Sequence, residues 1–318
     1  MTTPEIQKLC EKIKSEIEKV IIGKSENIDL ILTAIFSGGH VLLEDAPGTG
    51  KTMLAKTLAR CIDGNFSRIQ FTPDLLPSDV TGINFYDNSK NAFVFREGPV
   101  FANILLADEI NRATPRTQSS LLEAMEEKQV TVDGQTRRLP EPFFVIATQN
   151  PIETAGTFPL PEAQLDRFLM KLSMGLPNET DEMAILTNFM NNSPLETVEA
   201  LCTTALLSQI SETVRSIFVH PSIREYIIAI ANQTRRHPGI ALGLSPRGSL
   251  GLMRASQSLA AIYGREYVIP EDIKQLAVPV IAHRLIFSHS MSVSANAAAD
   301  IVLELINSIP VPTEEWRK

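Results

Sequence analysis

The sequence has few cysteines, and its histidines form no metal-binding pattern. Cys10, Cys61 and Cys202 are odd in number and show no C-x-x-C spacing. The histidines, which we interpret as structural, are His40, His220, His237, His283 and His289. These features argue against a disulfide framework and a zinc site, and they favour a reducing, cytoplasmic environment.

Long apolar runs and an excess of basic residues are also missing. No run approaches the roughly 20 apolar residues of a membrane-spanning helix, so we expect no direct membrane insertion. Residues 4–20 alternate charged with apolar residues and predict an amphipathic helix, not a signal peptide. The net charge is −8, and residues 1–176 carry 18 basic and 23 acidic side chains. Proteins that bind nucleic acid through its phosphates usually have a basic surface. This chain is acidic, so we expect no nucleic-acid partner.

A glycine-rich turn follows the apolar run His40 to Leu43 and precedes a helix-like stretch that starts at Met53. Gly48 and Gly50 leave backbone N–H groups free to converge on phosphate oxygens, and the N-terminus of the following helix adds partial positive charge. In such a loop a lysine neutralises the β and γ phosphates, and the next hydroxyl binds Mg²⁺. Lys51 and Thr52 fit these two roles.

One residue departs from the general pattern G-x-x-x-x-G-K-[ST], because position 45 is Asp45 where the pattern has glycine. An ordinary strand-to-helix turn with a surface lysine is the alternative interpretation. The residues that we expect to hold the nucleotide are Asp45, Ala46, Pro47, Gly48, Thr49, Gly50, Lys51, Thr52 and Met53.

A second nucleotide signature lies about fifty residues further along. Residues 102–107 predict a buried strand, and the acidic pair Asp108 and Glu109 stands at its carboxyl end. In an open parallel sheet this edge binds ligands. We assign Asp108 to Mg²⁺ and Glu109 to the general base that orients and deprotonates the attacking water.

Two further polar residues are candidates for the same reaction. Asn150 follows the predicted strand 143–148 and can hold the attacking water, although an asparagine before Pro151 also suits a turn. Arg167 can reach a phosphate in the transition state. From its own segment alone, a surface ion pair of Arg167 with Asp166 or Glu162 fits equally well.

Arg247 stands in the first turn of a predicted helix that begins with an N-cap serine and a proline, Ser245 and Pro246. A cation there opposes the helix dipole by several tenths of a kcal/mol, roughly. An anionic ligand would account for Arg247, and so would a contact with nearby carboxylates.

The motifs, in this order, resemble the MoxR group of AAA+ ATPases from about residue 21 to about residue 278. The strings that carry the resemblance are residues 44–52, 108–113, 118–126, 147–151, 159–168 and 245–247. An acidic residue at the first glycine position is frequent in that family. The resemblance implies that Asn150 is sensor 1, Arg167 the arginine finger and Arg247 sensor 2, with ATP and Mg²⁺ as cofactors.

Strands alternate with helices up to about Leu176, which predicts an α/β P-loop core with a parallel sheet over residues 1–176. Two β-hairpins, at residues 83–95 and 129–136, interrupt this pattern and are similar to the inserts of one AAA+ clade; each could equally be an edge strand. After Pro177 we expect an all-α lid domain over residues 177–318. Its predicted helices are 179–190, 195–217, 221–234, 246–263, 270–282 and 295–306.

The resemblance implies an ATPase that remodels, matures or activates partner proteins. The expected assembly is a homo-hexameric ring, because Arg167 should reach the nucleotide of a neighbouring subunit and head-to-tail contacts close into rings. A protein client and a partner with a von Willebrand factor A domain are expected. A nucleic-acid-stimulated motor of the helicase branch is the alternative. The client, the pathway and whether Arg247 serves its own nucleotide are not readable from the sequence.

Overall fold

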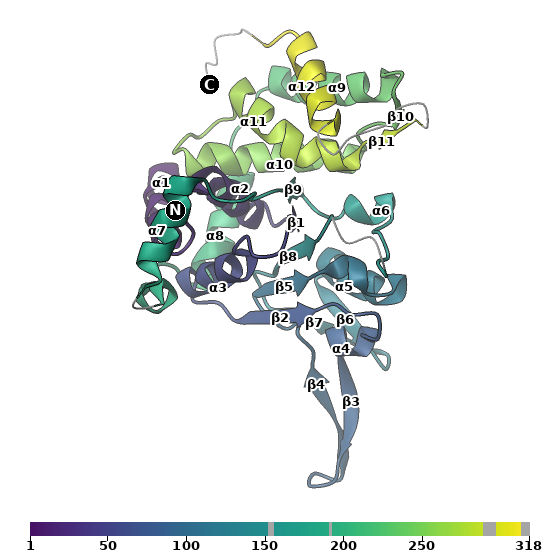
Figure 1. The fold of residues 1–318 in the computed structure, drawn as a ribbon. Helices are drawn as coiled ribbons and strands as arrows, with labels where there is room; N and C mark the ends of the chain where they lie inside the picture. The colour runs from purple at the N-terminus through teal and green to yellow at the C-terminus, as the bar shows by residue number, and fades with distance from the viewer. Residues whose placement is uncertain (152–155, 191–192, 289–296, 313–318) are drawn as a thin grey trace.

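A five-stranded parallel sheet forms the centre of the molecule, in the computed structural model that describes residues 1–151, 156–190, 193–288 and 297–312 (Figure 1). The strand order is β2-β5-β8-β1-β9. These strands are β1 (Val41–Glu44), β2 (Phe66–Gln70), β5 (Ile104–Asp108), β8 (Phe144–Gln149) and β9 (Met170–Leu172). The expected parallel sheet is confirmed, and all carboxyl ends therefore meet at one edge.

Alternate residues of the central strands point to opposite faces of the sheet, and each face has its own core. One core contains Val41, Leu43, Ile104, Leu106, Phe144 and Ile146. The other contains Leu42, Leu105, Ala107, Val145 and Ala147. Near-continuous apolar strands are what a sheet buried on both faces requires.

The first face is covered by α1 (Thr3–Glu18), α2 (Ser25–Phe36) and α3 (Lys51–Cys61). The opposite face is covered by α4 (Pro77–Thr81) and α5 (Pro115–Glu127), and the 3₁₀ turn η1 (Ile110–Arg112) precedes α5. The short helix α6 (Glu162–Leu165) leads into β9. The N-terminal amphipathic helix is confirmed, with Ile6, Cys10, Ile13 and Ile17 buried along one stripe.

Both predicted hairpins are present. One consists of β3 (Gly82–Asp87) and β4 (Ala92–Glu97) and projects from the body as an arm (Figure 1). The other consists of β6 (Gln129–Val132) and β7 (Gln135–Arg138). Its turn residues Asp133 and Gly134 have φ of 50° and 74°. Two consecutive left-handed residues match the twist of a two-residue hairpin, which explains the Asp-Gly pair.

The part of the chain after Pro177 is mostly helical, as expected. It comprises α7 (Glu179–Asn188), η2 (Pro194–Thr197), α8 (Thr204–Arg215), α9 (Pro221–Arg236), α10 (Pro246–Ile262), α11 (Pro270–Ile281), η3 (Ala282–Arg284) and α12 (Ala297–Ser308). The helix predicted over 195–217 is wrong in its first half, where extended residues precede α8 and Thr203 caps it. A two-stranded ribbon of β10 (Ile240–Leu242) and β11 (Ile286–Phe287) was not expected, because strands of two or three residues leave almost no periodicity to read. The predicted start of the last helix, 295–296, lies outside the described residues.

Packing crosses the predicted boundary at residues 176 and 177. Helix α10 lies against α1 and α2, and α11 lies against β9 (Figure 1). The larger core accordingly runs from the sheet into the C-terminal helices. Within the described ranges, no helix combines the length and the apolar character that crossing a bilayer requires.

Candidate active site

A cavity of about 430 Å³ opens at the carboxyl edge of the sheet. It is lined by Pro47, Gly48, Thr49, Gly50, Lys51, Thr52, Met53, Arg68, Gln70, Asp108, Glu109, Thr148 and Asn150. The loop after β1, the acidic end of β5 and the polar end of β8 therefore meet in one place. This is where an open parallel sheet places a ligand.

The loop between β1 and α3 has the backbone of a phosphate cradle. Gly48 and Gly50 have φ of 87° and 85°, a region that side chains rarely allow. A Cβ atom at Gly48 would meet nothing within 4 Å, so the approach to its backbone is open. Helix α3 begins at Lys51, whose ammonium donates to the carbonyl oxygens of Asp45 (2.9 Å) and Ala46 (3.2 Å).

Asp45 makes contacts that the sequence did not reveal. Its buried carboxylate accepts hydrogen bonds from the Ser173 hydroxyl (2.7 Å), the Met174 N–H (2.8 Å) and the Gly175 N–H (2.9 Å). Asp45 and Ala46 are absent from the described lining of the cavity. The carboxylate thus joins the start of the glycine-rich loop to the segment that leads into α7.

The acidic pair after β5 is held by neighbouring strands. Arg68 donates to Oδ2 of Asp108 through Nη2 (2.7 Å), and the Thr148 hydroxyl donates to Oδ1 (2.7 Å). Glu109 has a left-handed backbone, with φ of 55°. Its N–H donates to the Thr148 hydroxyl oxygen (2.9 Å), and its Oε2 accepts from Gln70 Nε2 (2.6 Å). A non-glycine residue at positive φ is uncommon and here turns the Glu109 side chain into the cavity.

Three lining residues, Arg68, Gln70 and Thr148, were not identified from the sequence as site residues. Arg68 and Gln70 lie on β2, a strand that we did not predict. The alternation of polar and apolar residues over Arg68, Ile69, Gln70 and Phe71 was a readable signal for this strand. Asn150 is buried and lines the cavity as expected.

An apolar cavity of about 200 Å³ adjoins the loop. Gly48, Thr49, Gly50 and Met53 line both cavities, so the loop borders each of them. The remaining lining residues are Val20, Ile21, Ile22, Lys24, Gly175, Pro177, Ile185 and Phe189. The loop therefore has a polar side toward the acids and an apolar side toward α7.

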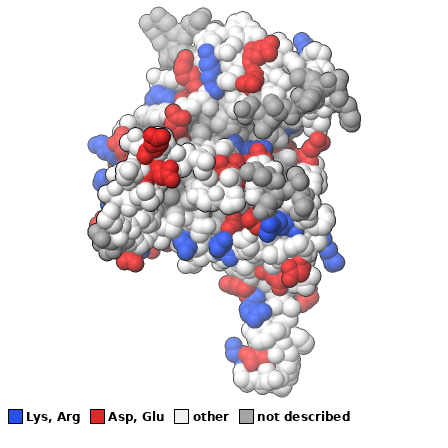
Figure 2. Space-filling model, viewed as in Figure 1, with Lys and Arg blue, Asp and Glu red and all other residues white. Residues whose placement is uncertain are grey.

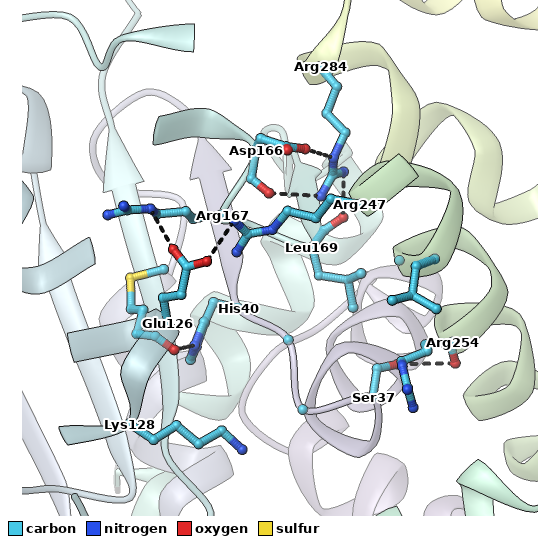
Figure 3. A pocket seen from close by; sticks show the side chains of 15 residues that line it. Ser37, His40, Glu126, Lys128, Asp166, Arg167, Leu169, Arg247, Arg254 and Arg284 are labelled. Carbon is cyan, nitrogen blue, oxygen red and sulfur yellow. Dashed lines mark hydrogen bonds and ion pairs between the residues drawn. The ribbon is translucent and has the colours of Figure 1, made fainter. Parts of the chain in front are cut away.

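Arg167 and Arg247 lie in a different cavity, of about 480 Å³ (Figure 3). His40, which comes just before β1, and Arg167, which comes just before β9, place this cavity at the amino edge of the sheet. The two cavities share no lining residue. The structure therefore does not bring Arg167 and Arg247 together with Lys51.

The two arginines share one carboxylate. Glu126 Oε2 lies 3.0 Å from Arg167 Nε, and Oε1 lies 3.1 Å from Arg247 Nη1 (Figure 3). The ion pair that we considered for Arg167, with Asp166 or Glu162, does not form. Asp166 instead forms an ion pair with Arg284, whose Nε lies 2.7 Å from Asp166 Oδ1.

Arg284 is a buried connector between the helical part and the segment that carries Arg167. Its guanidinium also donates to the carbonyl oxygens of Phe168 (2.6 Å) and Leu169 (3.0 Å). Burial lowers the pKa of Arg284, while the hydrogen bond to Asp166 opposes that shift. A buried guanidinium is stable only when such acceptors surround it.

His40 supports the fold through hydrogen bonds of both ring nitrogens. The buried His40 accepts from the Val145 N–H through Nδ1 (3.1 Å), and its Nε2 lies 3.2 Å from the Met125 carbonyl oxygen. Burial lowers the pKa of His40 to about 4. His289 lies outside the described residues.

Family models match both parts of the chain. Residues 40–170 match the ATPase family associated with various cellular activities (AAA), and residues 232–305 match the AAA lid domain.

Full-length relatives extend the match. The uncharacterized protein YeaC of Bacillus subtilis is 47% identical over 98% of this chain and 97% of its own. Chaperone MoxR1 of Mycobacterium tuberculosis is 40% identical over 95% of this chain and 82% of its own. Protein MoxR of Methylorubrum extorquens is 30% identical over 95% and 94%. A crystal structure of a Cytophaga hutchinsonii protein assigned as an ATPase superposes with a TM-score of 0.92 at 36% identity, covering 98% of this chain and 97% of that one.

Proposed function

Because this chain belongs to the MoxR family of AAA+ ATPases and is an ATP hydrolase, we propose that it uses ATP turnover to remodel, mature or activate partner proteins. The observation that carries the proposal is the meeting of the glycine-rich loop, both acids and Asn150 in one cavity. The chaperone named among its relatives supports the protein-directed use of this energy.

In the proposed site the phosphates lie on the loop. The N–H groups around Gly48 and Gly50, together with the start of α3, surround the phosphate oxygens, and Lys51 turns from the loop carbonyls to the β and γ phosphates. Glu109 orients and deprotonates the water that attacks the γ phosphate, and Asn150 holds that water. Gln70 keeps the Glu109 carboxylate at the cavity wall through its 2.6 Å hydrogen bond.

Thr52 and Asp108 fit a magnesium ion. A hydroxyl and one carboxylate in a water-accessible cavity are the oxygen ligands that Mg²⁺ takes while keeping several waters. The described residues contain no group of three or more potential ligands, such as a structural transition-metal site would need. When bound, Mg²⁺ neutralises the charge that develops on the phosphates.

The apolar cavity beside the loop suits the adenine base. Ile21, Ile22 and Met53 offer one apolar wall, and Ile185 and Phe189, at the end of α7, offer the other. A base held there would contact the core and the first lid helix together. Nucleotide binding would then couple to the angle between residues 1–176 and residues 177–318.

Arg167 and Arg247 complete the site of a neighbouring subunit in this proposal. Both lie at the sheet edge opposite to their own phosphate loop, so neither is placed to serve the nucleotide of its own chain. A head-to-tail contact brings the amino edge of one subunit to the carboxyl edge of the next, and closure of such contacts gives a ring. We propose a homo-hexamer, with Arg247 acting in trans like Arg167.

The β3–β4 arm is the part of the surface that we propose for the protein client, with a von Willebrand factor A domain protein as a further partner. The arm exposes Ile83, Phe85, Tyr86 and Phe93, and few charged side chains lie toward its tip (Figure 2). The nucleic-acid motor is not favoured, since the two MoxR relatives described above match nearly the whole chain and one of them is named a chaperone. We place the protein in the cytoplasm, because Cys10, Cys61 and Cys202 are free and buried.

The variant Glu109→Gln tests this function. We expect it to bind ATP like the wild type and to lose turnover by about 100-fold or more, since the general base is gone. Glu123→Gln, which changes an exposed acid of α5, should hydrolyse normally.

The same variant tests the protein-directed role. With ATP, Glu109→Gln should retain partner proteins that the wild type releases after hydrolysis, and Lys51→Ala should retain none. Normal turnover by Glu109→Gln would remove this residue from the role of base. Identical partner recovery with and without ATP would contradict remodelling.

A further inference from the structure

A single carboxylate holds the two arginines of the amino-edge cavity. Glu126 stands near the end of α5, Arg167 follows α6, and Arg247 is in the first turn of α10. The Glu126 side chain contacts both, at 3.0 and 3.1 Å (Figure 3). Three elements that are distant in sequence thus converge on one side chain.

Glu126 occupies only one side of each guanidinium. Arg167 uses Nε, and Arg247 uses Nη1. Among the described residues, the Arg167 guanidinium has no other ion-pair or hydrogen-bond partner; the backbone N–H of Arg167 donates to the Gln164 carbonyl oxygen. The two terminal nitrogens of Arg167 therefore remain available, and these form the fork that grips two phosphate oxygens at once.

The cavity has more positive than negative charge. Its lining cations are Lys128, Arg167, Arg247, Arg254 and Arg284, and its acids are Glu126 and Asp166. Asp166 is paired with the buried Arg284, so Glu126 is left to face two arginines alone. A surplus of cations with an open guanidinium fork fits an incoming polyphosphate.

Ion pairs with this exposure contribute little to stability. The side chains of Glu126, Arg167 and Arg247 are 38%, 28% and 45% exposed, and solvent screens such contacts. The contribution of Glu126 is therefore geometric. Arg167 and Arg247 are long side chains with many rotamers, and without Glu126 both must be ordered each time they meet the neighbouring nucleotide.

We propose that Glu126 is a positioning residue that presents Arg167 and Arg247 as one unit to the triphosphate held by the neighbouring subunit. This rests on the proposed shared site. In this role Glu126 does not contact the reacting phosphate; it sets the separation and direction of the two guanidinium groups. A misplacement of about 1 Å in such a group can lower the rate 100-fold.

The first test compares Glu126→Ala and Glu126→Gln with Glu127→Gln, an exposed neighbour on the same helix. We expect kcat to fall about 10- to 100-fold in both Glu126 variants. The Kd for ATP should stay unchanged, because the phosphate loop is at the opposite edge. Glu127→Gln should match the wild type. Wild-type kcat in Glu126→Ala, or a weakened Kd with unchanged kcat, would overturn the inference.

A second test asks whether Glu126 acts through the arginines. Adding Glu126→Ala to the double variant Arg167→Ala, Arg247→Ala should cause no further loss of kcat. A full additional loss would show that Glu126 acts on something else.

A third test uses mixed subunits. Glu126→Ala subunits mixed with Lys51→Ala subunits should recover turnover, because the latter donate intact arginines. Glu126→Ala mixed with Arg167→Ala should not recover, since both lesions lie on the same face. If Arg167→Ala with Lys51→Ala also fails, the shared site itself is wrong. If that pair recovers and Glu126→Ala with Lys51→Ala does not, only the inference about Glu126 is wrong.

Discussion

Asp45 occupies the position where the general phosphate-loop pattern has glycine, and its buried carboxylate takes three hydrogen bonds from Ser173, Met174 and Gly175. The residue after β1 is thereby fixed to the residues after β9. A glycine would leave those donors without this acceptor. The departure from the pattern thus has a structural reason, and it lies on the path between the nucleotide loop and α7.

The variant Asp45→Asn tests these hydrogen bonds between Asp45 and residues 173–175. An amide keeps the size of the side chain but sets an N–H₂ group against an N–H donor, so a buried hydrogen bond is lost. We expect the free energy of unfolding to fall by about 1–3 kcal/mol. Chemical denaturation measures it, with Asp63→Asn as the control because Asp63 is exposed and has a φ of 47° that asparagine accepts. Equal stability of Asp45→Asn and wild type would contradict the contribution of these hydrogen bonds.

Local sequence predicted that the glycine-rich loop, both acids and Asn150 lie at one edge of the sheet, because each motif is a continuous string next to a strand. The partners of Asp108 and Glu109 were missed, since Arg68 and Gln70 reach them across neighbouring strands. Glu126 was missed for a stronger reason. It is 121 residues from Arg247 in the chain, and nothing in the spacing of either segment signals their contact.

At the scale of elements, His40 connects three of them. It precedes β1, accepts from the N–H of Val145 in β8 and lies against the carbonyl of Met125 in α5. Both ring nitrogens are engaged in a neutral, fully buried ring, so protonation would break one contact and bury a charge. The same α5 end carries Glu126, which makes His40 part of the support for the amino-edge cavity.

The stability of the fold should fall in mild acid. The folded pKa of His40 is about 4, below its ordinary value of 6.5, so the unfolded chain binds the proton more tightly. The contribution of neutral His40 to stability is therefore fully present above pH 6.5 and is lost as the pH falls toward 4. Between pH 8 and pH 5, the titration of His40 alone should lower the free energy of unfolding by about 2 kcal/mol. His283, whose pKa burial also lowers, acts in the same direction.

Denaturant unfolding of wild type and His40→Gln at several pH values measures this effect. The variant should be less stable at pH 8 and should lose less stability on acidification. Parallel pH profiles for the two proteins would contradict the assignment.

The sequence predicted those elements in which the apolar pattern repeats over many residues. The central strands, both hairpins and most C-terminal helices follow from apolar spacing and from prolines at helix starts. Strands β2 and β9 and the β10–β11 ribbon were missed, and the helix over 195–217 was predicted too long. In those segments tertiary pairing decides the structure: Leu201 and Cys202 donate to the Cys61 carbonyl oxygen, which holds them extended instead of helical.

At the scale of the whole molecule, the parallel sheet has a different chemical role at each edge. The carboxyl edge holds the phosphate loop, the acids and Asn150, and the amino edge holds Arg167, Arg247 and Glu126. In the proposed assembly, each chain therefore contributes half of two sites. Head-to-tail association is the arrangement that would join complementary halves, and under the proposed function turnover is a property of the assembly.

The most direct measurement of this claim is ATP turnover in mixed assemblies of Arg167→Ala and Lys51→Ala subunits. Each variant alone should turn over ATP far more slowly than the wild type, because the first lacks the arginine that reaches the neighbouring nucleotide and the second lacks the lysine that binds its own phosphates. Mixed at equal concentration, they should recover a substantial part of the wild-type rate, because an Arg167→Ala subunit can bind ATP next to a Lys51→Ala subunit that donates Arg167. Assembly of the mixture is checked by its mass. Mixed assemblies that form and still fail to turn over ATP would contradict a site shared between subunits.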